Sequence, residues 1–152
     1  MRNIKFILTL IMFLPLFTFA QSEEVEEYIS EHYQFAQEVD SLYGIPASIC
    51  LAQAILESAY GESVLCKMAK NHFGIRDGNK WRKYKNAHES YMDYGLYFKV
   101  TSVVCEWPYG SGPKRWAEVL TICRYAGDVP EYGNELMLLI KQYNLTQYDR
   151  QI

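Results

Sequence analysis

The chain has 152 residues, which is enough for one domain and too few for two of ordinary size. With 49% hydrophobic and 22% charged residues, its composition is that of a globular protein and not of a disordered one. Residues 1–20 hold two of the 15 Lys and Arg and none of the 18 Asp and Glu, so the remaining chain has a formal charge of about −5. Because nucleic-acid binding depends on neutralising phosphates, this acidic balance, with no basic cluster expected, argues against a nucleic-acid partner.

The N-terminal segment has the plan of a secretory signal peptide. Arg2 and Lys5 supply positive charge, and an apolar stretch over residues 6–17 follows them. The small residue Ala20 then offers a cleavage site before Gln21.

A retained membrane anchor is the alternative interpretation of this segment. Its roughly 15 apolar residues are interrupted by Pro15 and fall short of the roughly 20 that a spanning helix needs. The sequence therefore predicts a signal peptide over residues 1–20 and one mature domain over residues 21–152. We expect that domain to be secreted or periplasmic, monomeric, and without an integral membrane segment.

All four cysteines lie in the predicted mature domain. An even number in an exported chain permits two disulfides, with three possible pairings that the sequence does not separate. Buried free thiols are the alternative, because at least one Cys lies in an apolar helical run. No CxxC or HExxH motif occurs, so no metal site is expected. The four are Cys50, Cys66, Cys105 and Cys123.

Hydrophobic periodicity predicts a mainly helical chain with one β-hairpin. Gly44 and Gly61 end two apolar runs, Pro46 opens the second of them, and Asp77-Gly78 suits the tight turn of a hairpin. The fold class is therefore mainly α (α+β), with the hairpin forming a small second lobe and a cleft expected between the lobes. In chain order, the predicted elements are helices over 23–43, 46–60 and 62–70, a hairpin over 73–84, and helices over 89–100, 114–125 and 130–143.

The helix predicted over residues 46–60 carries the clearest chemical signal. It is apolar on almost every side, as a central helix is, but Gln53 and Glu57 interrupt it on one face. Burial and the negative end of the helix dipole both disfavour a carboxylate, so the pKa of Glu57 should be raised. A protonated carboxylic acid is what general acid catalysis requires, whereas a structural Glu bonded to buried backbone or Arg would show the same pattern.

A second carboxylate is the usual partner of such an acid in a glycosidase. The candidates are Asp77, Glu89 and Asp93, and Glu89 is the best placed because it lies at the junction of hairpin and helix. An ordinary acid in the first turn of a helix would occupy the same position. The mature domain also holds all 13 Tyr, whose faces and hydroxyls can bind sugars, although most of them are expected to be structural.

Four motifs follow one another over about residues 30–149. They are Leu-Ala-Gln-Ala-Ile-Leu-Glu-Ser-Ala-Tyr-Gly-Glu-Ser at 51–63, Ala-Lys-Asn-His-Phe-Gly-Ile at 69–75, a Tyr…Glu-Ser…Asp-Tyr element at 84–94, and Tyr-Ala-Gly-Asp with a later Tyr at 125–132. Together they resemble the bacterial cell-wall N-acetylglucosaminidases of glycoside hydrolase family 73, the mannosyl-glycoprotein endo-β-N-acetylglucosaminidase-like domains. The residues around Gly127 and Val129 depart from the family pattern, and the cysteines are not part of it.

The resemblance implies a lysozyme-like fold with a groove between a helical lobe and a hairpin lobe. It implies that Glu57 is the general acid and Glu89 the acid of the hairpin lobe. The implied substrate is the glycan strand of peptidoglycan, cut at the β-1,4 bond after N-acetylglucosamine, with no metal or organic cofactor. The residues expected to bind that substrate are Gln53, Asn71, Phe73, Gly74, Tyr125 and Tyr132.

Two other functions remain open on the same fold. A lytic transglycosylase would use one Glu and leave an anhydro product, and a catalytically silent glycan-binding or assembly protein would need neither acid. Within the hydrolase interpretation, either Glu89 directs a water molecule or the N-acetyl group of the substrate attacks.

Overall fold

The computed structural model describes residues 4–102 and 105–150, with side chains from Ser22 onward. The side chains of the predicted signal peptide, residues 1–20, lie outside this description, and its cleavage stays a prediction. Among the described residues, no helix combines the length and apolar character that crossing a membrane requires.

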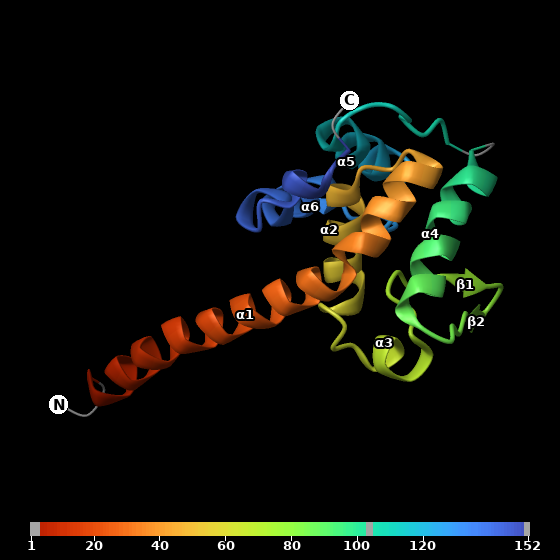
Figure 1. Cartoon of the computed structure of the whole chain (residues 1–152). Helices are drawn as coiled ribbons and strands as arrows, with labels where there is room; N and C mark the ends of the chain where they lie inside the picture. The colour runs from red at the N-terminus through yellow and green to blue at the C-terminus, as the bar shows by residue number, and fades with distance from the viewer. Residues whose placement is uncertain (1–3, 103–104, 151–152) are drawn as a thin grey trace.

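Helices dominate the fold, and most of them pack against α2 (Figure 1). The helices predicted from the sequence are confirmed with small shifts of their ends, except that the first, predicted to begin at residue 23, begins at Ile4. The short 3-10 helix η1 near the C-terminus was not predicted. The elements are α1 (Ile4–Tyr43), α2 (Ala47–Ser58), α3 (Val64–Ala69), α4 (Ala87–Thr101), α5 (Pro113–Ile122), α6 (Tyr132–Gln142) and η1 (Leu145–Tyr148).

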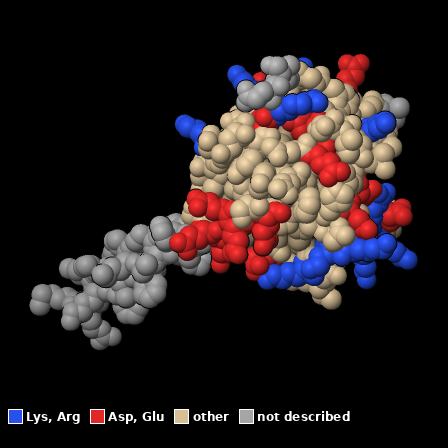
Figure 2. Space-filling model, in the orientation of Figure 1, with Lys and Arg blue, Asp and Glu red and all other residues tan. Residues whose placement is uncertain are grey.

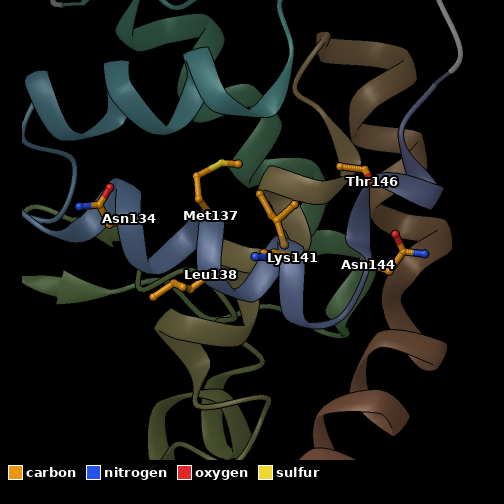
Figure 3. Close-up of a pocket in the computed structure, with 7 residues that line it drawn as sticks. Asn134, Met137, Leu138, Lys141, Asn144 and Thr146 are labelled. Atoms are coloured by element: carbon orange, nitrogen blue, oxygen red, sulfur yellow. The ribbon is translucent and has the colours of Figure 1, made fainter.

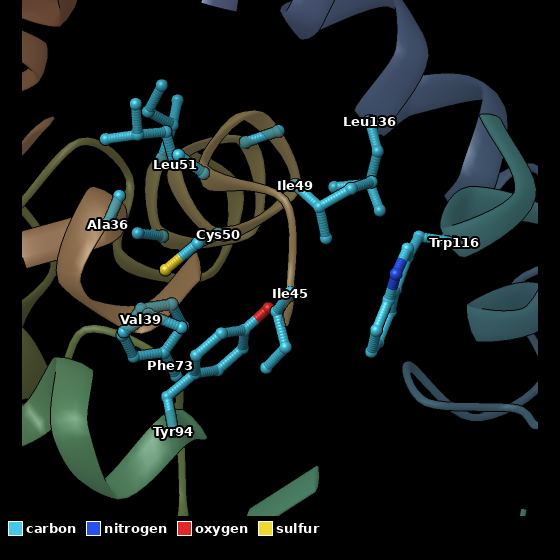
Figure 4. Packing of buried hydrophobic residues seen from close by; sticks show 14 of the residues in the cluster. Ala36, Val39, Ile45, Ile49, Cys50, Leu51, Phe73, Tyr94, Trp116 and Leu136 are labelled. Carbon is cyan, nitrogen blue, oxygen red and sulfur yellow. The ribbon is translucent and has the colours of Figure 1, made fainter. Parts of the chain in front are cut away.

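The central position of α2 follows from its apolar sequence. Every residue from Ala47 to Ile55 is buried, with α1, α5, α6 and η1 packed around the helix. Figure 4 shows part of this core, where Ile49 lies near Leu136 of α6. The helix ends at Ala59, which adopts a left-handed conformation with φ +49°. Glu57 therefore lies in the last turn, where the helix emerges from the core.

The hairpin lobe is small and is anchored by one buried amide. Strands β1 (Arg76–Asp77) and β2 (Lys80–Trp81) pair antiparallel, and Gly78 takes a positive φ in the turn between them. The Asn71 side chain donates to the carbonyls of Ile75 and Arg82 at 2.9 and 3.0 Å and accepts from the Ile75 amide at 3.1 Å. The predicted mainly α fold with a hairpin lobe is confirmed.

Two of the four cysteines form a disulfide and the other two are free thiols, so each of the two alternatives left open by the sequence applies to one pair. Cys105, which follows α4, forms a disulfide with Cys123 at the end of α5, and their Cα atoms lie 6.2 Å apart. Cys50 and Cys66 are buried free thiols. The bond therefore ties the segment between α4 and α5 to the end of α5. Of the two free thiols, Cys66 places its Sγ 3.5 Å from Nδ1 of His72.

Candidate active site

Glu57 is half-buried at the end of α2 and is held by one tyrosine. Its Oε1 accepts a hydrogen bond from the Tyr132 hydroxyl at 2.8 Å, across a separation of 75 residues in the chain. Burial raises the pKa of Glu57, and the hydrogen bond from Tyr132 offsets part of that effect. The predicted direction of the pKa shift is confirmed, with burial as its leading cause.

A chain of hydrogen bonds runs from the core to this carboxyl group. The Tyr94 hydroxyl donates to Oε1 of Gln53 at 2.5 Å, and Nε2 of Gln53 donates to the Tyr132 hydroxyl oxygen at 2.9 Å. Because the Tyr132 oxygen accepts from Gln53, the Tyr132 proton is free to point at Glu57. Gln53 and Tyr94 are fully buried, so Gln53 acts on Tyr132 in this structure and has no exposed atoms to offer a ligand.

Three tyrosines line up beside Glu57, and we call Tyr97, Tyr125 and Tyr132 the tyrosine row. The rings of Tyr125 and Tyr132 stack with centroids 5.9 Å apart, and Tyr97 meets Tyr125 edge-on at 6.0 Å. Burial, followed by the nearby Glu57 carboxyl, raises the pKa of Tyr125, so its hydroxyl stays a neutral donor. Tyr97 was not predicted as a site residue, although it shares a face of α4 with Glu89 and Asp93 at four-residue spacing.

Asp93, one of the alternative second acids, binds the hairpin lobe. Both of its carboxylate oxygens accept from Nη1 of Arg82, at 2.8 and 2.7 Å, and Oδ2 also accepts from the Tyr84 hydroxyl at 2.6 Å. These contacts join the chain just after β2 to the middle of α4. The Asp93 carboxylate is thus occupied by an ion pair with Arg82 that holds the hairpin lobe against α4.

Glu89 lies in the first turn of α4, where it binds the two residues that precede the helix. Its backbone N–H donates to Oδ1 of Asn86 at 2.9 Å, and its own Oε2 accepts from the Lys85 N–H at 2.9 Å. The side chain remains 41% exposed. Glu89 therefore stabilises the start of α4 and still presents a carboxylate to solvent, while no described hydrogen bond links it to Glu57 or Tyr132.

The other residues expected to bind substrate lie in the segment that leads into the hairpin. Asn71 and Phe73 are buried, and the Phe73 ring stacks on Tyr94 with centroids 4.0 Å apart. Gly74 is half-buried with φ +63°, and a Cβ atom there would lie 3.7 Å from the Trp81 ring. Asn71 thus supports the hairpin lobe, and Phe73 packs against Tyr94, the first residue in the chain of hydrogen bonds to Glu57. Gly74 is the most exposed of the three residues.

A family model described as mannosyl-glycoprotein endo-beta-N-acetylglucosaminidase matches residues 33–145, which is most of the chain. The chain belongs to the glucosaminidase family. This is a family of glycoside hydrolases, and the fold is lysozyme-like, as the four sequence motifs predicted. The match includes Glu57, Glu89 and the whole tyrosine row.

Similar proteins include two autolysins and a glucosaminidase from different bacteria. The autolysin of Enterococcus faecalis is 32% identical, covering 84% of this chain and 21% of the relative. Exo-glucosaminidase LytG of Bacillus subtilis is 29% identical, covering 95% of this chain and 61% of the relative. The crystal structure of the catalytic domain of autolysin Auto from Listeria monocytogenes has a TM-score of 0.72 and 26% identity, covering 83% of this chain and 88% of that one. The chain thus spans between about a fifth and three fifths of the length of these two curated relatives.

A cavity of about 700 Å³ lies elsewhere, along α6 and the segment that follows it (Figure 3). Its lining is largely apolar and includes Met137 and Leu138. None of its lining residues belongs to the candidate site around Glu57. Among the described residues, no group of three or more His, Cys, Asp and Glu side chains could hold a metal ion.

Proposed function

We propose that this glucosaminidase is an exported peptidoglycan hydrolase that cuts the β-1,4 bond after N-acetylglucosamine, with Glu57 as its general acid. The observation that carries the proposal is a half-buried carboxyl group with a raised pKa, held by one directed hydrogen bond from Tyr132. Protonated Glu57 donates its proton to the leaving glycosidic oxygen as the bond breaks. The Tyr132 hydroxyl then stabilises the carboxylate that remains.

The sugar binds, in this proposal, against the tyrosine row and the surface near Gly74. Tyr125 is half-buried and offers part of its ring and its neutral hydroxyl. Gln53, Asn71 and Phe73 contribute by holding that surface in place, because their own side chains are buried. This division separates residues that touch the sugar from residues that position them.

The nucleophile is either a water molecule or the N-acetyl group of the substrate. The exposed carboxylate of Glu89 supports the first route, since its cap leaves Oε1 only a long 3.9 Å contact with Nζ of Lys85. The second route needs a single strong protein acid, which Glu57 supplies. Replacing Glu89 with Gln separates attack by water from attack by the N-acetyl group.

Mass spectrometry of digested, purified peptidoglycan tests the reaction itself. Fragments with reducing N-acetylglucosamine ends are the expected products. Anhydro-muramic ends would instead identify a lytic transglycosylase, and an undigested sample would leave a silent glycan-binding protein. The lengths of the first fragments distinguish internal cleavage, which the family description names, from the terminal cleavage that the name of the Bacillus subtilis relative describes.

Export is part of the proposal and rests on the residues 1–20 pattern. N-terminal sequencing of the protein recovered from the cell envelope or medium should begin at Gln21. An N-terminus at residue 1 or 2 in a membrane fraction would instead show a retained anchor.

A further inference from the structure

The positive charge of this chain is concentrated in one segment, which we call the basic lobe, residues 67–85. It carries seven Lys or Arg and one acidic residue, Asp77, for a formal charge of +6. The remaining residues from 22 onward carry 17 acidic and six basic residues, for a formal charge of −11. The sequence-based expectation that no basic cluster exists is therefore wrong, because the low net charge concealed this separation.

The basic lobe is exposed and only partly neutralised. All seven basic side chains are exposed, and Figure 2 shows Lys and Arg atoms as a strip along the lower edge of the molecule, beside a cluster of acidic ones. Ion pairs join three of the seven to acidic residues: Lys67 to Glu62, Arg82 to Asp93 and Lys85 to Glu89. No described residue forms an ion pair with the other four, which are Lys70, Arg76, Lys80 and Lys83.

The basic lobe is continuous with the proposed active site. Arg82 and Tyr84 at its end both bind Asp93 of α4, which shares its helix face with Tyr97 of the tyrosine row. The row ends at the hydrogen bond to Glu57. A polymer bound along the row with one sugar at Glu57 would therefore extend toward the unpaired lysines.

We propose that the basic lobe binds the carboxylates of the peptide substituents on the glycan strand, beside the sugar held at Glu57. This inference rests on the proposed function. The sugar rings of a β-1,4 glycan are neutral, whereas peptides attached to every second sugar carry carboxylates at regular intervals. The acidic remainder of the molecule repels the same carboxylates, so the charge separation orients the enzyme with its lobe on the strand.

The test compares one polymer with and without its carboxylates. Purified sacculi, freed of covalently attached phosphate polymers, are used untreated or after carbodiimide coupling of their carboxylates to ethanolamine. At low salt the wild-type enzyme should digest the untreated sacculi at least about fivefold faster than the coupled ones. Salt near 0.5 M should remove this difference, because the distance over which charges act, roughly 10 Å at 0.1 M salt, becomes shorter still. The lobe variant K70Q/K80Q/K83Q should digest both samples at similar rates.

A matched control removes three exposed lysines outside the lobe. The body variant K99Q/K114Q/K141Q has the same net charge as the lobe variant and should keep the wild-type preference. Equal rates of the wild-type enzyme on both samples, or a full preference in the lobe variant, would overturn the role of the lobe while leaving the hydrolase proposal intact. If the wild-type enzyme digests neither sample, the proposed function itself fails.

Discussion

At Glu57 the carboxyl group proposed as the general acid is subject to two opposed influences. Burial favours the protonated form. The Tyr132 hydroxyl, whose oxygen accepts from Gln53 and whose proton points at Glu57, favours the carboxylate. A general acid needs both, because it must hold its proton before the reaction and be stabilised without it afterwards.

Removing the acid proton is the direct test of this assignment. Glu57→Gln keeps the size and hydrogen-bonding capacity of the side chain and cannot donate a proton to the leaving oxygen. We expect the rate on purified peptidoglycan to fall by at least about a hundredfold, with binding of the glycan retained. Full activity in this variant would remove Glu57 from the mechanism.

Glu89→Gln serves as the companion variant and separates the two nucleophiles. Gln can still accept from the Lys85 N–H, so the start of α4 should be preserved. If Glu89 directs water, the loss should also reach about a hundredfold, and added azide should restore part of the rate by attacking the sugar itself. A small loss without an azide effect would favour attack by the N-acetyl group.

The Tyr132 hydroxyl should set the alkaline limit of activity. Activity requires protonated Glu57, so it is lost as pH rises through the pKa of that group. Tyr132→Phe removes the hydrogen bond that lowers this pKa, and the alkaline limb of the kcat/KM profile should move up by as much as about one pH unit. Tyr125→Phe is the control, because its hydroxyl makes no described hydrogen bond to Glu57. Coincident alkaline limbs in wild type and Tyr132→Phe would contradict the role of Tyr132.

Among the elements, those with a strong local pattern were predictable and the links between them were not. The apolar run of α2 and the turn residues of the hairpin each follow from spacing within a few residues. The hydrogen bonds that run from Tyr94 through Gln53 and Tyr132 to Glu57 join residues 41 to 79 positions apart in the sequence. No local sequence pattern predicts contacts over such separations. The sequence thus indicated which face of α2 holds the candidate general acid but not that Gln53 would be wholly buried there.

The close packing of α5 and α6 also depends on a contact that spacing does not reveal. A Cβ atom at Gly133 would lie 2.5 Å from the backbone oxygen of Ala117 and 2.7 Å from the Thr121 hydroxyl, which accepts from the Gly133 N–H. Gly133→Ala should therefore lower the free energy of unfolding by about 1–3 kcal/mol, as overpacking does. It should also reduce activity, because Tyr132 is the adjacent residue.

Gly112→Ala is the matched control for this prediction. A Cβ atom there meets nothing within 4 Å, and φ is −75°, so only the modest loss of a favourable N-cap is expected. Urea denaturation of both variants measures the difference. Equal stability of Gly133→Ala and Gly112→Ala would show that α6 can shift without cost.

For the molecule as a whole, the attachment of α1 to the loop before the hairpin and to α4 should depend on pH. The Tyr28 hydroxyl of α1 lies 2.7 Å from Nδ1 of His72 and 3.2 Å from the Tyr91 hydroxyl of α4. The buried His32 ring lies between the same elements, with its centroid 5.0 Å from that of His72. Burial, the neighbouring His32 and the positive Lys70 lower the pKa of His72 to about 4, and burial also lowers the pKa of His32.

Both histidines are therefore neutral in the folded enzyme and gain protons more readily when the chain unfolds. Folding depresses the pKa of His72, so the full stability of the fold is present at pH values above the unfolded pKa near 6.5. Part of that stability is lost as pH falls from there toward the folded pKa of about 4. We expect the free energy of unfolding, measured in urea, to fall by about 2–3 kcal/mol between pH 7.5 and 4.5 through His72 alone. His72→Gln should remove that part of the pH dependence, whatever its effect on stability at pH 7.5. His88→Gln, which changes an exposed ring paired with Glu38, should retain it. An unchanged difference between the two pH values in His72→Gln would show that acid lability arises elsewhere in the molecule.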